Sequence, residues 1–288
     1  MAEIKLSAAI RSNLLALQQT AILVSKTQGH LSTGLKVASA VDDAVAFFQA
    51  KALSNRAGDL AEKKDSIDQG ISSLTTALQT VQSTEDLFQQ MKGLVLSAKS
   101  GTDADRVTLA SSFNTLSAQT DNLVNDASYQ GLNLVNSTAT FLKVTFSEKT
   151  ASFLQVDGKN ILVSTFAGLT VAAPSVLATA ITGLTDGWSA VSNNLSRFDA
   201  LISVLDSAIT TIRTNAQELG SNVSLLQTRL DFTTQYVNTL TGGSDKLTLA
   251  DLNEEGANLV ALQTRQQLAT QALAFAGRSE QAVLQLFL

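Results

Sequence analysis

The sequence predicts a mainly α-helical protein: a long antiparallel helical bundle or coiled coil with a small β-hairpin insertion. Apolar residues recur at alternating steps of three and four over long stretches, which is typical of a coiled-coil seam. Pro174 is the only proline in 288 residues, and a proline inside a helix costs about 3 kcal/mol. A central segment contains the turn pair Asp157-Gly158 between apolar runs, which indicates a hairpin.

The N-terminal half contains three apolar stripes with helical spacing. The first comprises Ile10, Leu14, Leu17, Ala21, Val24 and Leu31. The second comprises Leu60, Ile67, Ile71, Leu74, Leu78, Val81 and Phe88, and the third comprises Leu109, Phe113, Leu116, Leu123 and Ala127. Two pairs, Ser39 with Asp42 and Thr102 with Asp105, have the spacing of a capping box, which predicts a helix start at each.

The middle of the chain differs in pattern. Apolar and polar residues alternate around 141–146, and the runs 153–156 and 161–163 flank the Asp157-Gly158 pair. We expect residues 137–187 to form a small β-rich insertion.

The C-terminal third carries the longest seam. It comprises Leu195, Phe198, Ile202, Leu205, Ile209, Ile212, Ala216, Leu219, Val223, Leu226, Leu230, Val237 and Leu240, broken only by Thr233. A helix of this length spans about 70 Å and needs a partner along the whole seam. The simplest arrangement is an antiparallel bundle with the second and third stripes.

The last helix is apolar on more than one face. Thr248 and Asp251 have capping-box spacing, and after Arg265 the only charges are Arg278 and Glu280. A helix that is apolar nearly all round is buried, whereas chain ends tend to fray. Burial between subunits resolves that conflict. Charged residues are also only 16% of the chain, against about 25% in average soluble proteins.

Composition excludes several classes of function. The net charge is −5 without a cluster of basic residues, so no nucleic-acid partner is expected. Since no run reaches 18 apolar residues, no membrane span is expected. The chain has no cysteine and a single histidine, His30, which excludes a His-Glu-x-x-His metal site. Asp42-Asp43 and Glu254-Glu255 suit helix starts. We therefore predict no catalytic residue, cofactor or metal, and no enzyme activity.

Three separate motifs resemble the bacterial flagellin family. Leu31-Ser-Thr-Gly-Leu-Lys-Val-Ala-Ser-Ala-Val-Asp-Asp-Ala44 is similar to its N-terminal signature. Ala250-Asp-Leu-Asn-Glu-Glu255 and Val283-Leu-Gln-Leu286 resemble the start and end of its C-terminal helix. Asp126-Ala-Ser-Tyr-Gln-Gly-Leu-Asn-Leu134 resembles its turn out of the N-terminal helices, where Phe-Asn-Gly is commoner. The resemblance covers about residues 1–140 and 190–288, with only a minimal central insertion.

The resemblance implies three regions. Terminal helices 1–40 and 246–288 would pair as an inner coiled coil, 41–136 and 188–245 would form an outer-tube helical domain, and 137–187 would be the insertion. The implied polymerisation residues of the inner tube are Ile10, Leu14, Leu17, Val24, Leu31, Leu259, Leu262, Leu273, Phe275, Val283 and Leu286. The implied outer-tube seam comprises Leu74, Leu78, Val81, Phe88, Leu205, Ile209, Ile212, Leu219 and Leu226.

The function implied is that of a secreted structural subunit, which polymerises into the extracellular flagellar filament and serves motility. Implied partners are further copies of the chain, the type III flagellar export apparatus with an export chaperone, the filament cap and the hook–filament junction proteins. The family is also recognised by a vertebrate innate immune receptor. The corresponding stretch here contains Gln90 and Gly93, where an arginine and a glutamate are usual, followed by Leu94.

Two alternative functions are open at this point. A hook–filament junction protein has related ends, but tends to carry a proline near Ser39-Ala-Val-Asp42, which this chain lacks. A secreted membrane-active translocator would require long apolar helices or basic amphipathic faces, and neither is present.

Overall fold

The computed structural model describes residues 8–147, 151–166 and 195–286. Their helices are α1 (Ala8–Thr33), α2 (Ala44–Ser100), α3 (Asp103–Asp126), α5 (Leu195–Thr248) and α6 (Leu252–Leu286). Strands β1 (Phe141–Thr145) and β2 (Phe153–Asp157) precede a 3₁₀ turn, η1 (Val163–Thr165). The chain forms two compact units, Met1–Ala57 with Asn238–Leu288 and Gly58–Val237. Residues 167–194 of the predicted insertion and outer domain lie outside the described residues.

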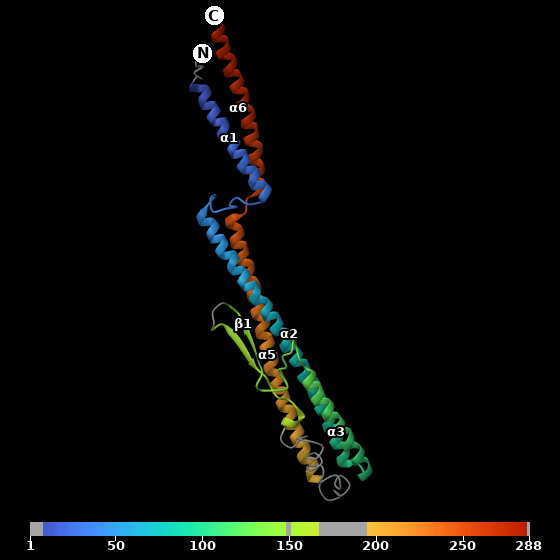
Figure 1. The fold of residues 1–288 in the computed structure, drawn as a ribbon. Helices are drawn as coiled ribbons and strands as arrows, with labels where there is room; N and C mark the ends of the chain where they lie inside the picture. The colour runs from blue at the N-terminus through green and yellow to red at the C-terminus, as the bar shows by residue number, and fades with distance from the viewer. Residues whose placement is uncertain (1–7, 148–150, 167–194, 287–288) are drawn as a thin grey trace. The chain divides into compact units, whose positions relative to one another are not determined.

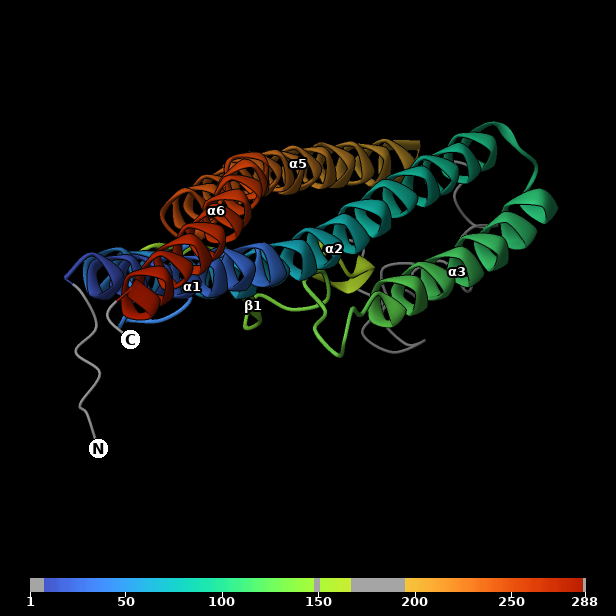
Figure 2. The ribbon, with the colours of Figure 1, turned by 90° about the horizontal axis from the view of Figure 1, so that it is seen from above.

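The larger unit, Gly58–Val237, is the predicted helical bundle with a hairpin. In Figures 1 and 2, α2 and α5 run side by side and α3 folds back beside the end of α2. A single apolar core joins the three helices, the hairpin and the segment that follows it. Its largest fully buried side chains are Phe88, Phe113, Ile67, Leu74, Met91, Ile161, Leu205, Ile212, Leu219 and Leu226. The mainly helical fold class is thereby confirmed.

The core follows a seven-residue repeat on both long helices. Buried residues on α5 lie every seven positions: Phe198, Leu205, Ile212, Leu219, Leu226 and Thr233. Thr233, which interrupts the apolar stripe in the sequence, is still only 4% exposed.

The stripe predicted on α3 was wrong at one position, because Leu123 is 36% exposed. Among the described side chains of that helix, the predicted Phe113 is buried, together with Ser117, Thr120 and Val124.

One of the three predicted capping boxes is confirmed. Thr102 caps α3, with its hydroxyl accepting from the Asp105 amide and the Asp105 carboxylate accepting from the Thr102 amide. The other two predictions were wrong by a few residues. Asp43 caps α2 by accepting from the Ala46 amide, and Asp251 caps α6 by accepting from the Asn253 amide. In both cases an aspartate directly before the helix caps its first turn, in place of the predicted Ser or Thr farther upstream.

The hairpin forms at a different place from the predicted turn. Strands β1 and β2 pair antiparallel, with Phe141 opposite Asp157 and Thr145 opposite Phe153. Asp157 therefore ends the second strand, and the pair Asp157-Gly158 is not the hairpin turn. Gly158 donates its amide to the Thr140 carbonyl at 2.7 Å, and an added Cβ would lie 2.3 Å from the Ser137 carbonyl oxygen. Glycine is needed here for a close approach between backbones.

Specific contacts hold the hairpin and the following turn onto the larger unit. Val144 packs over Gly70 of α2, where an added Cβ would lie 2.6 Å from the valine Cγ2. The Asp121 carboxylate on α3 accepts from the Val163 amide at 2.7 Å. Burial raises the pKa of the Asp121 carboxyl above its ordinary value, although this hydrogen bond opposes the shift.

The smaller unit contains the antiparallel pair of terminal helices α1 and α6, which contact each other (Figure 1), together with the start of α2 and the end of α5. Backbone hydrogen bonds join the segment after α1 to the one before α6: Lys36 donates to Thr248, and Ala250 donates to Gly34. Gly34 adopts φ +71°, a conformation that glycine tolerates best.

Candidate assembly surface

The seam between α1 and α6 buries little. Of the described α1 side chains, Ile10, Thr20 and Thr27 are buried, whereas no described α6 side chain is fully buried. The Thr20 hydroxyl donates to the Ala16 carbonyl of its own helix at 2.8 Å. A seam that contains threonines and half-buried leucines stabilises a helix pair less than an all-apolar seam does.

A polar side-chain contact joins one end of this pair. His30 Nδ1 lies 2.6 Å from Glu255 Oε1, and both side chains are 17% exposed. His30 thus lies at the end of α1 and Glu255 in the first turn of α6. This contact gives the only histidine of the chain a structural partner.

Several large apolar side chains on the smaller unit are exposed. Leu14 is 38% exposed, Ile22 is 68% exposed and Phe275 is 74% exposed. The exposed apolar residues of this unit are Leu14, Leu15, Ile22, Leu23, Val41, Val45, Phe48, Leu249, Leu252, Val260, Leu268 and Phe275, which we call the outward apolar surface. Apolar side chains left in water are available for burial against another molecule.

The predicted polymerisation residues fall into three groups. Ile10 is buried, and a second set is half-buried: Leu17, Val24, Leu31, Leu259, Leu262 and Leu273. Leu14 and Phe275 belong to the outward apolar surface. Val283 and Leu286 lie in α6, but their side chains are outside what the structure describes. Sequence reasoning missed the exposed Ile22, Val41 and Phe48, although Val41 lies within the quoted N-terminal motif.

The loop from α1 to α2 is held by a carboxylate. Asp42 accepts hydrogen bonds from the Ser39 hydroxyl at 3.0 Å and from the Ser39 and Ala38 amides. The Ser39 hydroxyl and amide lower the pKa of the Asp42 carboxyl below its ordinary value. These bonds fix a turn that leaves Val41 almost fully exposed.

The residues predicted for the outer-tube seam lie in the core of the larger unit. All are buried except Leu78, which packs half-buried against the core. Met91, Val95 and Ala98 extend this core and were missed, although they continue the three–four spacing beyond Phe88. In the stretch that resembles the immune-receptor site, Gln90 and Gly93 are exposed. Leu94 is half-buried and borders a shallow groove against α3.

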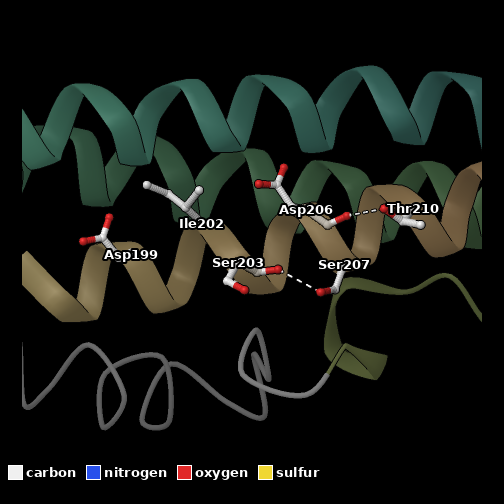
Figure 3. Close-up of a pocket in the computed structure, with 6 residues that line it drawn as sticks. All are labelled: Asp199, Ile202, Ser203, Asp206, Ser207 and Thr210. Carbon is white, nitrogen blue, oxygen red and sulfur yellow. Dashed lines mark hydrogen bonds between the residues drawn. The ribbon is translucent and has the colours of Figure 1, made fainter.

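A shallow groove along α5 is lined by two aspartates, and both form ion pairs with lysines of α2. Figure 3 shows its lining residues, which are Asp199, Ile202, Ser203, Asp206, Ser207 and Thr210. Asp199 and Asp206 form ion pairs with Lys99 and Lys92 of α2. The Ser207 hydroxyl donates to the Ser203 carbonyl at 2.9 Å. The carboxylates and this hydroxyl are thus engaged in structural contacts.

Many hydroxyl groups on the helices bond within their own helix. Thr76, Thr80, Thr210, Thr214 and Thr264 each donate to the carbonyl four residues earlier, at 2.8–3.0 Å. Although threonine is a polar residue, the hydroxyl donors of these side chains are already used in hydrogen bonds within the helix.

The described residues contain neither a metal cluster nor a membrane-spanning helix. Among residues 8–147, 151–166 and 195–286, no group of three His, Cys, Asp or Glu side chains is placed to hold a metal ion. None of the described helices combines the length and apolarity needed to cross a membrane.

Comparisons with known proteins cover most of the chain. Residues 5–140 match the bacterial flagellin N-terminal helical region, and residues 202–287 match the bacterial flagellin C-terminal helical region. The flagellin FljM of Caulobacter vibrioides is 31% identical over 279 residues, covering 95% of each chain. A Brucella melitensis flagellin is 25% identical over 288 residues, covering 100% of this chain and 99% of its own.

One solved structure shares the fold. A putative flagellar hook-associated protein from Vibrio parahaemolyticus superposes with a TM-score of 0.58. The match covers 71% of this chain and 99% of that one at 16% identity. At this identity the likeness concerns the fold, not the role.

Proposed function

The chain belongs to the bacterial flagellin family, and we propose that its subunits join through the outward apolar surface of the paired terminal helices. It is a structural protein of the extracellular flagellar filament, serving motility by polymerising with copies of itself, and it is not an enzyme. The relatives that support this role match over nearly their whole length and are named flagellins. The hook-associated alternative has only the fold likeness behind it.

The observation that carries the proposal is the contrast between the two units. The larger unit covers its heptad seam with its own helices, whereas the terminal pair exposes Leu14, Ile22 and Phe275. Burying these side chains against other copies removes apolar area from water, worth about 1.5–3 kcal/mol for each fully buried large side chain. The same contacts recur in every subunit of a helical polymer.

We infer the same regions as those expected from the family. Residues 1–40 and 246–288 form the inner tube, 41–136 and 188–245 form the outer tube, and 137–187 are the insertion. The structural support for the first region is the direct contact between α1 and α6. The proposed inner-tube residues include the half-buried Leu17 and Leu262, which hold this pair together, and the exposed Leu14 and Phe275, which meet neighbouring subunits.

The test is a single charge on the proposed surface. Leu14→Asp should leave the monomer folded, because this side chain is 38% exposed there. It should abolish filament growth, since burying an unpaired carboxylate in every subunit costs several kcal/mol per site. Seeded polymerisation followed by electron microscopy measures the outcome, with Leu14→Met as the matched apolar control. Normal filaments from Leu14→Asp would remove this surface from the proposal.

We further infer partners that act before and during assembly: the flagellar export apparatus, an export chaperone, the filament cap and the hook–filament junction proteins. Family membership supports this inference. Affinity-tagged monomer with and without residues 250–288 can be used to capture these components from a flagellated host. Equal recovery with both chains would argue against the C-terminal helix as their docking element.

We also propose that the vertebrate flagellin receptor responds weakly to this chain. Gln90 lacks the planar fork of charged donors that arginine offers, and Gly93 offers no carboxylate. Both positions are exposed, so the double change Gln90→Arg with Gly93→Glu alters the surface without disturbing the core. A reporter-cell dose response with monomer should show low potency, raised by the double change. Potency equal to that of a strongly recognised flagellin would contradict this proposal.

A further inference from the structure

Three ion pairs connect α2 with α5 inside the larger unit. They are Glu85–Arg213 at 2.7 Å, Lys92–Asp206 at 2.5 Å, and Lys99–Asp199. Each step of seven residues forward on α2 is matched by a step of seven backward on α5, as antiparallel helices require. We call these six residues the charge ladder. Its members are partly exposed, and it borders the groove drawn in Figure 3.

The apolar seam alone does not define one offset between the two helices. Buried side chains recur every seven residues on α5 and also on α2, where they are Ile67, Leu74, Val81, Phe88 and Val95. Sliding one helix by a heptad moves it about 10 Å. After that shift, apolar residues again face apolar residues along most of the seam.

The order of charges distinguishes these offsets. A one-heptad shift in one direction would place Lys92 opposite Arg213, a like-charge pair. The same shift would leave Glu85 opposite Gly220, without a partner. After this shift only one opposite-charge pair would form, between Lys99 and Asp206, in place of the three native pairs.

A shift in the other direction is penalised in the same way. It would place Glu85 opposite Asp206, again a like-charge pair, and Arg213 opposite the apolar Leu78. The remaining opposite-charge pairing would be Lys92 with Asp199. Only the observed offset satisfies all three pairs.

We propose that the charge ladder selects the antiparallel register of α2 and α5. Ion pairs on a protein surface contribute little stability individually, so the ladder matters through the difference between correct and shifted pairings. Charges that flank an apolar seam choose partner and orientation in coiled coils by the same physics. Here both partners belong to one chain, separated by more than 90 residues at the nearest pair.

Spin labels can measure the register directly, because the chain has no cysteine. The exposed residues Gln82 and Gln227 are changed to Cys, labelled with nitroxides, and the full-length monomer is refolded from denaturant. Electron–electron double resonance then reports the distance between α2 and α5. One variant reverses the α2 charges through Glu85→Lys, Lys92→Glu and Lys99→Glu. A compensated variant adds Arg213→Glu, Asp206→Lys and Asp199→Lys.

The unaltered chain should give one narrow distance distribution. Reversal on α2 alone should broaden it or move it by several ångströms, since a one-heptad sliding of about 10 Å adds to a fixed lateral separation, and should lower the urea midpoint. The compensated variant should restore both measurements. Concentrated salt should weaken the effect of one-sided reversal, since exposed charges are then screened.

Two outcomes would overturn the proposal. One is a one-sided reversal that keeps both the distance and the midpoint of the unaltered chain. The other is a compensated variant that stays shifted, because the effect would then come from the substitutions and not from their pairing. If the one-sided variant does not fold, the compensated variant decides: recovery of the native distance supports the ladder, and failure to recover it contradicts it.

Discussion

Asp121 illustrates how one side chain connects the helices to the segment after the hairpin. Its carboxylate accepts a hydrogen bond from the Val163 amide, and Val163 itself is fully buried. Desolvation raises the pKa of this carboxyl above its ordinary 3.8. The folded state therefore binds this proton more tightly than the unfolded chain does. The stability that Asp121 confers is present below pH 3.8 and is lost as the pH rises through the raised folded pKa.

Replacing Asp121 separates the hydrogen bond from the charge. Asp121→Asn keeps an acceptor for the Val163 amide and removes the desolvated charge. Its free energy of unfolding should therefore rise relative to the unaltered chain as the pH increases from 3 to about 7. Asp121→Ala leaves a buried donor unpaired and should cost about 1–3 kcal/mol. Urea unfolding at several pH values measures both, and a pH-independent difference for the asparagine variant would contradict this account.

Two glycines of α2 provide a matched pair of substitutions. Gly93 has no neighbouring atom within 4 Å of an added Cβ, so Gly93→Ala should stabilise the chain by about 0.5–1 kcal/mol through helix propensity alone. Gly70→Ala places its Cβ 2.6 Å from Val144 Cγ2 and should destabilise the packing of the hairpin, by about 1–3 kcal/mol. Thermal unfolding distinguishes them. Equal stabilisation by both would show that Val144 moves aside freely.

At the scale of elements, the sequence predicted the long helices well because their core repeats. The three–four spacing around Phe88 and Leu205 survives in the buried positions. Local choices were less predictable. Ser39, Asp42 and Asp43 all suit a helix start, but Asp42 binds back to Ser39 and it is Asp43 that caps α2. Asp157-Gly158 matches a turn motif. In the structure, however, Gly158 is needed because the backbone of Ser137–Thr140 comes too close for a side chain.

The candidate surface was predictable only in part for a related reason. A helical repeat identifies which side chains share a face, and it grouped Leu14 with Leu17 on one stripe. In the structure Leu17 is half-buried, whereas Leu14 is 38% exposed. The partner helix decides where a seam ends, and the sequence of a single helix does not contain that information.

Removing the end of α6 should separate assembly from folding. A chain without residues 272–288 loses Leu273 and Ala276 from the seam with α1 and Phe275 from the outward apolar surface. It should form no filaments. The core of Gly58–Val237 contains no α6 residue, so its cooperative unfolding should be unchanged. Circular dichroism and electron microscopy report the two properties, with full-length Phe275→Leu as the assembly-competent control. Filaments from the truncated chain would disprove the role of α6.

For the whole molecule, the two units should differ in local stability. The terminal pair has few buried side chains, whereas the larger unit has a continuous core. Local opening needs less free energy where few contacts are lost. Brief proteolysis of verified monomer should therefore cut first within about residues 1–40 and 250–288, leaving a fragment that contains 58–237. The same sites should be protected in filaments. Equal resistance of both units in the monomer would refute this difference.

The helix-internal bonds of the threonine hydroxyls affect what a neighbouring molecule encounters. An interface of free donors must be matched group for group, and a misplaced neighbour leaves some of them unpaired. The hydroxyls of Thr76, Thr210 and Thr264 already donate to carbonyl oxygens of their own helices. A neighbouring molecule therefore does not have to supply an acceptor for them. At each such position a neighbouring molecule can be displaced by a fraction of a turn without leaving the hydroxyl donor unpaired.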